Sequence, residues 1–309
     1  MATRLVVLLL GALVLLRAAG TEQGTLPVLL VGTLPLVLLL AWPVLLVAGL
    51  RRDRRLGLAA VALVAVHLLV LAPAVVASPA PPPDAPRLRV AVANLYVLNP
   101  DPRRTGEALR ALALDVLVVP ELTAAGLAGL RASGLTEDLP YALVPGEAAQ
   151  ETVGLFSRHP LSAVALRSGA GRLLPRATVQ VGGRQVRVLA AHTLPPVTVL
   201  QRDWRRGLRD LAAEVRETRL PVVVVGDLNA DRDHGAFRPL LGTGLVDAAD
   251  ERGRGLQGTW PARVPLLHLD HVLVRGGTGA GVVPADVRTV RLPGTDHRAV
   301  VADLALLPG

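Results

Sequence analysis

Hydrophobic residues fill the start of the chain in three long stretches, residues 5–19, 26–50 and 56–77. A helix needs about 20 apolar residues to cross a bilayer core, and the second and third stretches reach that length. The first is shorter and contains Arg17, so it could be either a signal peptide or a third transmembrane span. It has no clear small-residue cleavage pattern and two spans follow it, which favours retention. We therefore expect residues 1–77 to form a membrane anchor of about three transmembrane helices.

Arginines are distributed unevenly between the two loops of this anchor. Arg51, Arg52, Arg54 and Arg55 lie between the second and third stretches, whereas residues 20–25 contain no arginine and one acid, Glu22. Positively charged loops stay in the cytoplasm. The pattern predicts a multi-pass protein of the cell membrane, with everything after residue 77 on the extracytoplasmic side.

A proline-rich segment, SPAPPPDAP at residues 78–86, follows the anchor directly. Such a composition favours an extended, semi-rigid spacer over a helix or a core strand. We expect it to act as a linker that holds a domain formed by residues 87–309 away from the membrane.

Beyond the linker, short apolar runs alternate with amphipathic segments and with glycine and proline. Strands are predicted at residues 88–95, 115–119, 153–157, 177–181, 185–191, 222–226, 268–274 and 299–304. Residues 199–217 predict a packing helix, because Leu200, Trp204, Leu208, Leu211 and Val215 recur every three or four positions. A hairpin around Gly182 and Gly183 favours an α+β sandwich of about eight to ten strands over a strictly alternating parallel sheet.

Composition restricts the chemistry more than the fold. All 33 basic residues are arginine, which is typical of GC-rich coding, so the isoelectric point near 11.3 is a weak nucleic-acid signal. Residues 78–309 contain 27 arginines and 23 acids, a net charge of only +4. The chain has no cysteine, which excludes disulfides, thiolate metal sites and a cysteine nucleophile. A metal would have to be held by oxygen or imidazole groups.

Five of the predicted strands have a carboxylate, amide or imidazole near one end. The clearest case is VVVVGDLNA, in which four valines precede Asp227 and Asn229. The other four strands supply Asn94, Glu121, His192 and Asp270, and Asp296 and His297 precede the last strand. One polar residue at a strand end is usually a cap or a turn former, but five together predict a shared site.

The order and spacing of these motifs resemble the endonuclease/exonuclease/phosphatase superfamily, the metal-dependent phosphoesterases with the fold of pancreatic deoxyribonuclease. The resemblance covers about residues 87–306 and depends on VANL, DVLVVPE, GLFSRHPL, AAHTLPP, GDLNA, HLDHVLV and GTDHRAV. It implies a four-layer α/β/β/α sandwich of two mixed β-sheets, preceded here by the transmembrane helices.

The resemblance also implies a metal site with oxygen ligands. Glu121 matches the family's metal-binding glutamate, and Asn94 matches an amide that orients this glutamate or the phosphate. Asp296 matches an acid near the metal, and Mg²⁺ or Mn²⁺ is the expected ion. The family usually has Gln before that glutamate, and Pro120 stands there in this chain. The substitution affects the expected substrate geometry more than the expected metal binding.

Catalytic roles follow from the same resemblance. His297 matches the imidazole that contacts the scissile phosphate, and Asp270 its carboxylate partner. Asp227 matches the group that orients or deprotonates water, and Asn229 a donor to a phosphoryl oxygen. His192 matches a general acid for the leaving group in the deoxyribonuclease and sphingomyelinase branches.

Several other residues near these motifs have simpler interpretations. Glu151 stands where the carboxylate partner of the His192-type histidine is found, which is a weaker match. His159, His234, His268 and His271 are interpreted as surface or packing residues. Trp260 is expected to pack beneath the site.

Two functions of different classes fit the sequence. The first is a membrane-tethered, metal-dependent hydrolase of phosphoester bonds, acting on nucleic acid, a phospholipid head group or a small phosphorylated metabolite. The net charge of +4 gives little of the field that steers nucleic acid to a protein. The second is a non-catalytic envelope module for binding or assembly on the same fold. Contact with the bilayer is expected through the N-terminal helices, and no obligate protein partner is implied.

Overall fold

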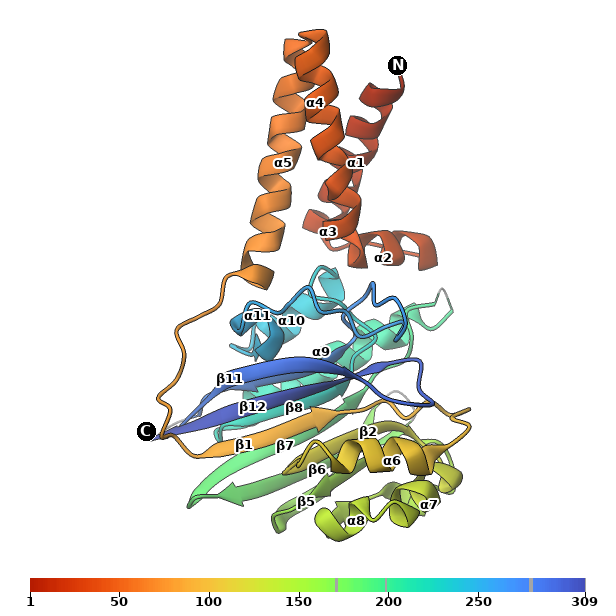
Figure 1. Ribbon diagram of the computed structural model, residues 1–309, viewed down its shortest axis with the longest axis vertical. Coiled ribbons are helices and arrows are strands. Elements are labelled where there is room, and N and C mark those ends of the chain that lie inside the picture. The colour runs from red at the N-terminus through yellow and green to blue at the C-terminus, as the bar shows by residue number, and fades with distance from the viewer. Residues whose placement is uncertain (170–171, 198, 278–279, 309) are drawn as a thin grey trace.

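The computed structural model describes residues 1–169, 172–197, 199–277 and 280–308, which form a helical bundle above a β-sandwich (Figure 1). The bundle consists of α1 (Ala2–Ala19), α2 (Thr25–Gly32), α3 (Leu34–Val37), a 3₁₀ turn (Leu38–Leu40), α4 (Ala41–Arg51) and α5 (Arg54–Val75). Three helical stretches are long and apolar enough to cross a membrane: Ala2–Ala19, Leu34–Arg51 and Arg54–Val75. The turn that carries the arginine cluster lies at the end of the bundle away from the sandwich.

The second apolar stretch is not one helix, contrary to the expectation for residues 26–50. The chain bends at Thr33, whose hydroxyl donates to the carbonyl of Leu29 (2.8 Å), and Pro35 follows in the first turn of α3. A proline lacks the N–H that would continue the hydrogen-bond ladder. As a result α2 is a separate short helix that lies across the foot of the bundle (Figure 1).

Twelve strands in the described residues make two six-stranded sheets. The first has the order β11 (Ala280–Arg291), β12 (Arg298–Pro308), β1 (Arg87–Val92), β2 (Val116–Leu122), β4 (Thr152–Ser157) and β3 (Tyr141–Leu143). The second has the order β5 (Leu161–Gly169), β6 (Arg172–Val181), β7 (Arg184–His192), β8 (Val222–Asp227), β10 (Asp270–Arg275) and β9 (Val246–Asp247). Both sheets are mixed, because β1 and β2 are parallel, β7 and β8 are parallel, and the remaining pairs are antiparallel.

Helices cover the outer faces of both sheets, which confirms the four-layer α/β/β/α sandwich. The first sheet packs against α6 (Pro102–Arg110), α7 (Ala124–Ala132) and α8 (Leu135–Asp138). The second packs against α9 (Gln201–Glu217) and α10 (Arg238–Leu241), and α11 (Ala248–Glu251) follows β9. Two further 3₁₀ turns lie at Pro145–Ala148 and Gly235–Phe237. The main core lies between the sheets and consists largely of valine, leucine and alanine.

All eight predicted strands and the predicted packing helix are present. The hairpin is confirmed as well: Gly182 and Gly183 form a two-residue turn with φ of 55° and 75°, the positive values that this type of turn requires. The expected strand count was too low, because β3, β5, β9 and β11 were not predicted. In β11, Pro284 stands at a bulge, where a proline does not have to donate to the ladder.

The valine strand β8 is buried on both faces, as its composition predicts. Val223 and Val225 face the core between the sheets, while Val222 and Val224 pack against the layer of α9. The strand then passes close to β7 at Gly226. A Cβ atom on Gly226 would lie 1.8 Å from the carbonyl oxygen of Ala191. Only glycine allows the two strands to approach this closely.

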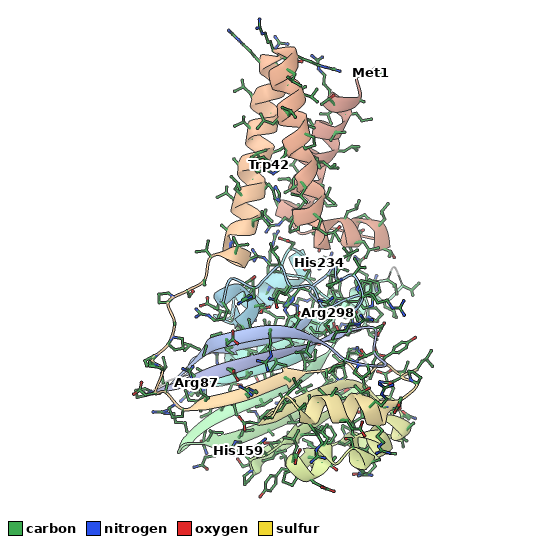
Figure 2. All side chains as sticks on the ribbon, in the orientation of Figure 1. Met1, Trp42, Arg87, His159, His234 and Arg298 are labelled. Atoms are coloured by element: carbon green, nitrogen blue, oxygen red, sulfur yellow. The ribbon has the colours of Figure 1, made fainter. Side chains whose placement is uncertain are left out.

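The domain packs against the helical bundle of residues 1–77, the predicted anchor, rather than being held away from it. Arg17 of α1 forms an ion pair with Asp233 (2.7 Å), and buried Glu22 accepts a hydrogen bond from the backbone N–H of Gly235 (2.9 Å). Val28 of α2 joins the core that packs around α9. His234, at this junction in Figure 2, is 2.9 Å from the carbonyl of Val28 through Nε2.

The proline-rich segment runs along the domain instead of separating it from the anchor. Ser78 donates to the carbonyl of Glu251 (2.9 Å), and the carbonyl of Pro86 accepts from the N–H of Leu306 (2.9 Å). The expectation of a distancing spacer is therefore wrong. The physical reason is that the polar ends of α1 and the apolar face of α2 find partners on the domain.

Replacing Gly226 by alanine should destabilise the full-length protein by about 3 kcal/mol or more, because the added carbon meets a backbone carbonyl that cannot move away alone. Gly183→Asn is the matched control, since no described heavy atom lies within 4 Å of a Cβ there and asparagine tolerates a positive φ. Unfolding of both variants in detergent measures the difference, and equal stabilities would contradict the close-packing argument.

Replacing Glu22 by alanine should lower the stability of the full-length protein by about 2 kcal/mol, because the N–H of Gly235 loses its acceptor and Arg205 loses a buried carboxylate partner. Glu217→Ala, at an exposed position of α9, should change it by less than about 0.5 kcal/mol. Hydrogen exchange should show faster exchange of α2 only in the first variant. An unchanged α2 would mean that Glu22 does not hold the anchor to the domain.

Candidate active site

The polar groups at the strand ends meet at one edge of the sandwich. Asp227 at the end of β8 is the Cα partner of His192 on β7 and of Asp270 on β10. Residues two apart along a strand share a face, and Val223 and Val225 face the inter-sheet core. Asp227 therefore points between the sheets, with His192 and Asp270 beside it.

Asn94, just after β1, joins the first sheet to the second. Its side-chain nitrogen donates to Glu121 Oε1 and to Asp227 Oδ2, both at 3.0 Å. Its oxygen accepts from the N–H of Tyr96 (2.9 Å), so the amide orientation is determined by its surroundings. Two carboxylates from different sheets are thus held at one amide group.

Glu121 reaches this position through an irregular backbone. Leu117 and Val119 face the outer helices, so a regular strand would turn Glu121 the same way. Instead β2 has a register shift between Val119 and Leu122, and Glu121 has a φ of 54°. Its second oxygen accepts from the N–H of Val97 (3.0 Å). Pro120, which replaces the family's usual Gln, is buried and its carbonyl accepts from the N–H of Leu95 (3.0 Å).

His297 and Asp270 form the predicted pair. His297 Nδ1 lies 2.7 Å from Asp270 Oδ2 and 3.9 Å from Asp227 Oδ2. The bond to Asp270 fixes the ring, and Nε2 is the remaining nitrogen for a substrate. His192 lies on the other side of Asp227, with Nε2 at 4.0 Å from Asp227 Oδ2 and Nδ1 at 3.7 Å from Glu151 Oε1.

Asn229 is held beside Asp227 by the turn after β8. Its backbone N–H donates to Asp227 Oδ1 (2.8 Å), its side-chain nitrogen donates to the carbonyl of Thr193 (3.0 Å), and its φ is 45°. A positive φ at a residue other than glycine is uncommon, and asparagine is among the side chains that tolerate it best. The turn directs the amide toward the same edge as the other groups.

Burial and mutual charge shift the ionisation of this cluster. Burial, together with the charge of Asp270, raises the pKa of Asp227 to about 7. Burial opposes the charged form of His297, but the carboxylates of Asp270 and Asp227 outweigh it and raise the pKa of His297 to about 10. Burial likewise opposes ionisation of Asp270, yet the charge of His297 lowers the pKa of Asp270. The unliganded site thus favours an imidazolium paired with a carboxylate.

The residues present fit a divalent cation. Two groups have ligand atoms within 4.8 Å of one another: Glu121 with His192 and Asp227, and Asp227 with Asp270 and His297. Asp270 Oδ1 is buried and accepts no hydrogen bond from the described residues. A donor set dominated by carboxylates suits Mg²⁺ or Mn²⁺. A cation would also relieve the repulsion among these acids.

Asp296 is the predicted ligand that lies apart from this cluster. Its Oδ2 accepts from Trp260 Nε1 (3.3 Å), and its Oδ1 has no partner among the described residues. It joins none of the three groups of candidate ligands found in the described part of the chain, which are the two at this edge and a third at Asp247, His268 and His271. Its part in metal binding therefore stays a prediction.

Three threonines that position the site were not singled out from the sequence. Thr259 Oγ1 accepts from the N–H of Asp270 (3.2 Å), Thr295 Oγ1 donates to the carbonyl of Asn94 (3.0 Å), and Thr193 provides the carbonyl for Asn229. Thr193 and Thr295 stand next to predicted site residues, which is the only signal the sequence offers. Thr259 has no such signal.

The histidines interpreted as surface or packing residues lie outside the cluster. His234, His268 and His271 are buried, and His268 and His271 lie near Asp247 at 3.7 and 2.5 Å. His159 is partly exposed and 3.7 Å from Asp115.

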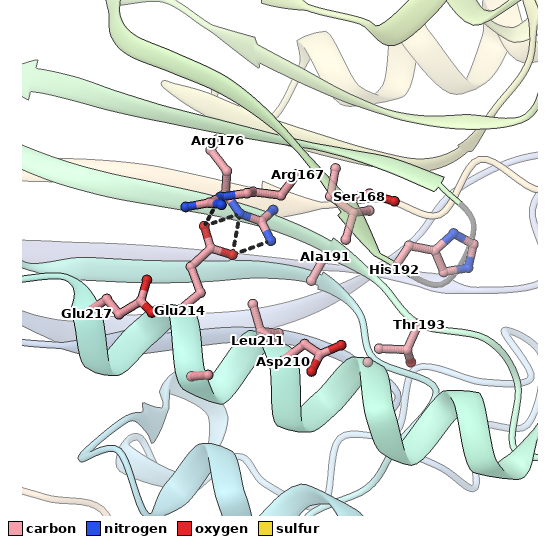
Figure 3. A pocket seen from close by; sticks show the side chains of 13 residues that line it. Arg167, Ser168, Arg176, Ala191, His192, Thr193, Asp210, Leu211, Glu214 and Glu217 are labelled. Atoms are coloured by element: carbon pink, nitrogen blue, oxygen red, sulfur yellow. Dashed lines mark hydrogen bonds and ion pairs between the residues drawn. The ribbon is translucent and has the colours of Figure 1, made fainter.

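A hollow of about 320 Å³ lies beside His192 (Figure 3). Charged and apolar side chains both line it, and we call it the polar hollow because of its charged groups. It extends along α9 to the ion pair of Arg176 with Glu214 (2.8 Å), which joins β6 to α9. Arg167, Asp210 and Glu217 also line it. This mixed set of charges differs from the buried carboxylates at the strand ends.

Comparisons with known proteins identify the family of the chain and its fold. The model of the Endonuclease/Exonuclease/phosphatase family matches residues 91–297, which is more than half of the chain. No curated protein matches the chain by sequence.

Several solved structures share the fold at low sequence identity. TDP2 from D. rerio, solved with a single-strand DNA product, is 16% identical with a TM-score of 0.58, covering 71% of this chain and 98% of its own. An endonuclease/exonuclease/phosphatase from Beutenbergia cavernae is 22% identical, with a TM-score of 0.55 and 72% coverage of both chains. Beta toxin from Staphylococcus aureus is 15% identical, with a TM-score of 0.52 and coverage of 70% and 99%. The chain, with its two mixed sheets and the motifs at their shared edge, belongs to the Endonuclease/Exonuclease/phosphatase family.

Proposed function

We propose that the protein is a membrane-anchored, divalent-metal-dependent hydrolase of phosphoester bonds. The observation that carries this proposal is the convergence of carboxylate, amide and imidazole groups from both sheets on Asp227. Hydrolysis of a phosphoester requires neutralisation of the phosphoryl oxygens, an oriented water and a proton for the leaving oxygen. The cluster offers a group for each requirement.

Glu121 and Asp227 would hold the cation, with Asn94 orienting both carboxylates, and a part for Asp296 stays a prediction. When bound, Mg²⁺ or Mn²⁺ supplies positive charge at the phosphoryl oxygens. Asn94 contributes by keeping the two carboxylates close together despite their repulsion, since one amide nitrogen donates to both.

The remaining groups hold the phosphate and move protons. His297 and Asn229 bind phosphoryl oxygens, and Asp270 keeps Nε2 of His297 directed at them. Asp227 orients the attacking water and accepts its proton. His192, with Glu151 at its other nitrogen, donates a proton to the leaving oxygen.

The location follows from the anchor. Three helices of sufficient length and exposed leucines on their surfaces support a multi-pass membrane protein. The arginine-rich turn lies at the far end of the bundle from the domain, and by the positive-inside rule it is cytoplasmic. The catalytic domain is then extracytoplasmic.

Purified full-length protein in detergent should hydrolyse bis(4-nitrophenyl) phosphate with Mg²⁺ or Mn²⁺ and lose this activity in a chelator. Asp227→Ala and His297→Ala should each lower the rate by about 10³-fold, because a water-orienting group or a phosphate contact is lost. Glu137→Ala, at an exposed position of α8 outside the site, is the control and should retain the rate. Activity that survives in both site variants would refute the assignment.

The roles of Glu121 and Asp270 should separate in a metal titration. Glu121→Gln should raise the Mg²⁺ concentration for half-maximal activity by about 10- to 100-fold, because it weakens a ligand. Asp270→Asn should lower the maximal rate and leave that concentration nearly unchanged, since Asp270 acts through His297. If both variants shift the metal requirement equally, Asp270 is a metal ligand rather than a positioning residue.

A further inference from the structure

A second cavity, distinct from the polar hollow, lies between the catalytic groups and the anchor. It has a volume of about 360 Å³, and we call it the anchor-side cavity. Asn229 and His297 line its catalytic end, and Val28 and Leu29 of α2 line the opposite end. Val197 and Leu269 form part of the walls between them. The anchor thus builds one side of a cavity that ends at the phosphate-binding groups.

Two polar side chains that line this cavity outside the catalytic pair, His234 and Trp260, are already engaged. His234 accepts from the N–H of Asp231 through Nδ1 (2.7 Å) and bonds the carbonyl of Val28 through Nε2 (2.9 Å). Trp260 donates its N–H to Asp296, which leaves its ring as apolar surface. Trp260 therefore lines this cavity rather than only packing beneath the site. Away from Asn229 and His297, the described walls are mainly apolar, so burying a charged ligand group there would cost hydration free energy, whereas burying an alkyl chain would be favourable.

The position of α2 connects the cavity with the membrane. This helix crosses the foot of the three long helices (Figure 1) and exposes Leu26 to 66% and Leu29 to 42%. Val197, on the loop across the cavity, is 40% exposed. Apolar side chains at the level where spanning helices leave a bilayer are typical of an interfacial helix. A chain that leaves the bilayer would meet apolar surface all the way to His297.

We propose that the substrate is a phosphoester that carries a long hydrocarbon chain, a lipid of the membrane to which the protein is anchored. This inference rests on the proposed function and names its substrate class. The chain occupies the anchor-side cavity, and the phosphoryl group lies at His297 and Asn229. Water adds to phosphorus, the bond from phosphorus to the leaving oxygen breaks, and that oxygen takes a proton. The leaving group is the polar substituent, which lies on the side of His192 and the polar hollow. The hydrocarbon chain lies in the other cavity and remains bonded to the phosphate.

The test compares two esters that differ only in chain length, methyl and hexyl 4-nitrophenyl phosphate, with the full-length protein in nanodiscs. The unchanged protein should show a kcat/KM for the hexyl ester at least ~10-fold above that for the methyl ester, because each buried methylene contributes several-fold. Leu29→Gln and Val197→Gln should each reduce this ratio at least ~5-fold. Leu26→Gln, the same change on the outer face of α2, is the matched control and should keep it.

The outcomes separate the two proposals. Equal kcat/KM values for both esters, or an equal loss in Leu26→Gln and Leu29→Gln, would overturn the lipid inference and leave the phosphoesterase standing. If neither ester is hydrolysed, the proposed function fails, and calorimetry with methyl- and hexylphosphonate then tests the cavity alone. Hexylphosphonate that binds at least ~10-fold more tightly, with the difference lost in Leu29→Gln, would support the lipid inference. Equal binding of the two phosphonates would reject it.

Discussion

The burial of the Asp227 carboxylate is the constraint on which the site depends. At 1% exposure this group cannot be hydrated, and an unpaired buried carboxylate costs several kcal/mol. Asn94, the N–H of Asn229 and the nearby imidazole of His297 offset that cost, and they come from both sheets and from the loop before β12. The sandwich must therefore close correctly before Asp227 is stable. The same closure brings the catalytic groups together, so folding and preparation of the site are one event.

Much of the fold and the site could be predicted because both depend on local pattern. The eight predicted strands have apolar runs in which alternate residues face a core, and their polar ends identify the shared edge. The strand-end pattern predicted that Glu121 belongs to the shared site, and family resemblance added its metal-binding role, but neither explains how its side chain turns inward. By its position in β2 it should face the helices, and only the bulge with a φ of 54° turns it inward. Backbone strain of this kind leaves no pattern in the sequence. The same holds for Thr259, whose hydroxyl reaches Asp270 across eleven residues.

The packing of the predicted anchor against the domain could not be predicted from the sequence, for a different reason. A proline-rich segment predicts stiffness but not direction, and here it runs along the domain it was expected to hold away. Arg17 and Glu22 connect the bundle to the domain. In the sequence each is a single charge next to an apolar stretch, a pattern that indicates only the end of a helix. Their partners, Asp233 and Gly235, lie more than 200 residues later. Spacing along the sequence cannot show which distant residue pairs with an isolated charge. In the structure, Val28 is buried beside α9, and this packing brings Arg17 and Glu22 close to their partners.

The docked anchor changes what the sandwich can select. Two spaces flank the catalytic groups, a polar hollow at His192 and an apolar cavity closed by α2 at His297. If the predicted anchor only kept the domain at the membrane, α2 would not need to line the cavity next to Asn229 and His297, the proposed phosphate-binding residues. A net charge of +4 over the domain offers little attraction to a polyanion, and the proposed selectivity for a lipid depends instead on the apolar surface near His297. The helix α2 belongs to the helical bundle and also lines this cavity. In the proposed function, attachment and substrate choice therefore depend on the same helix.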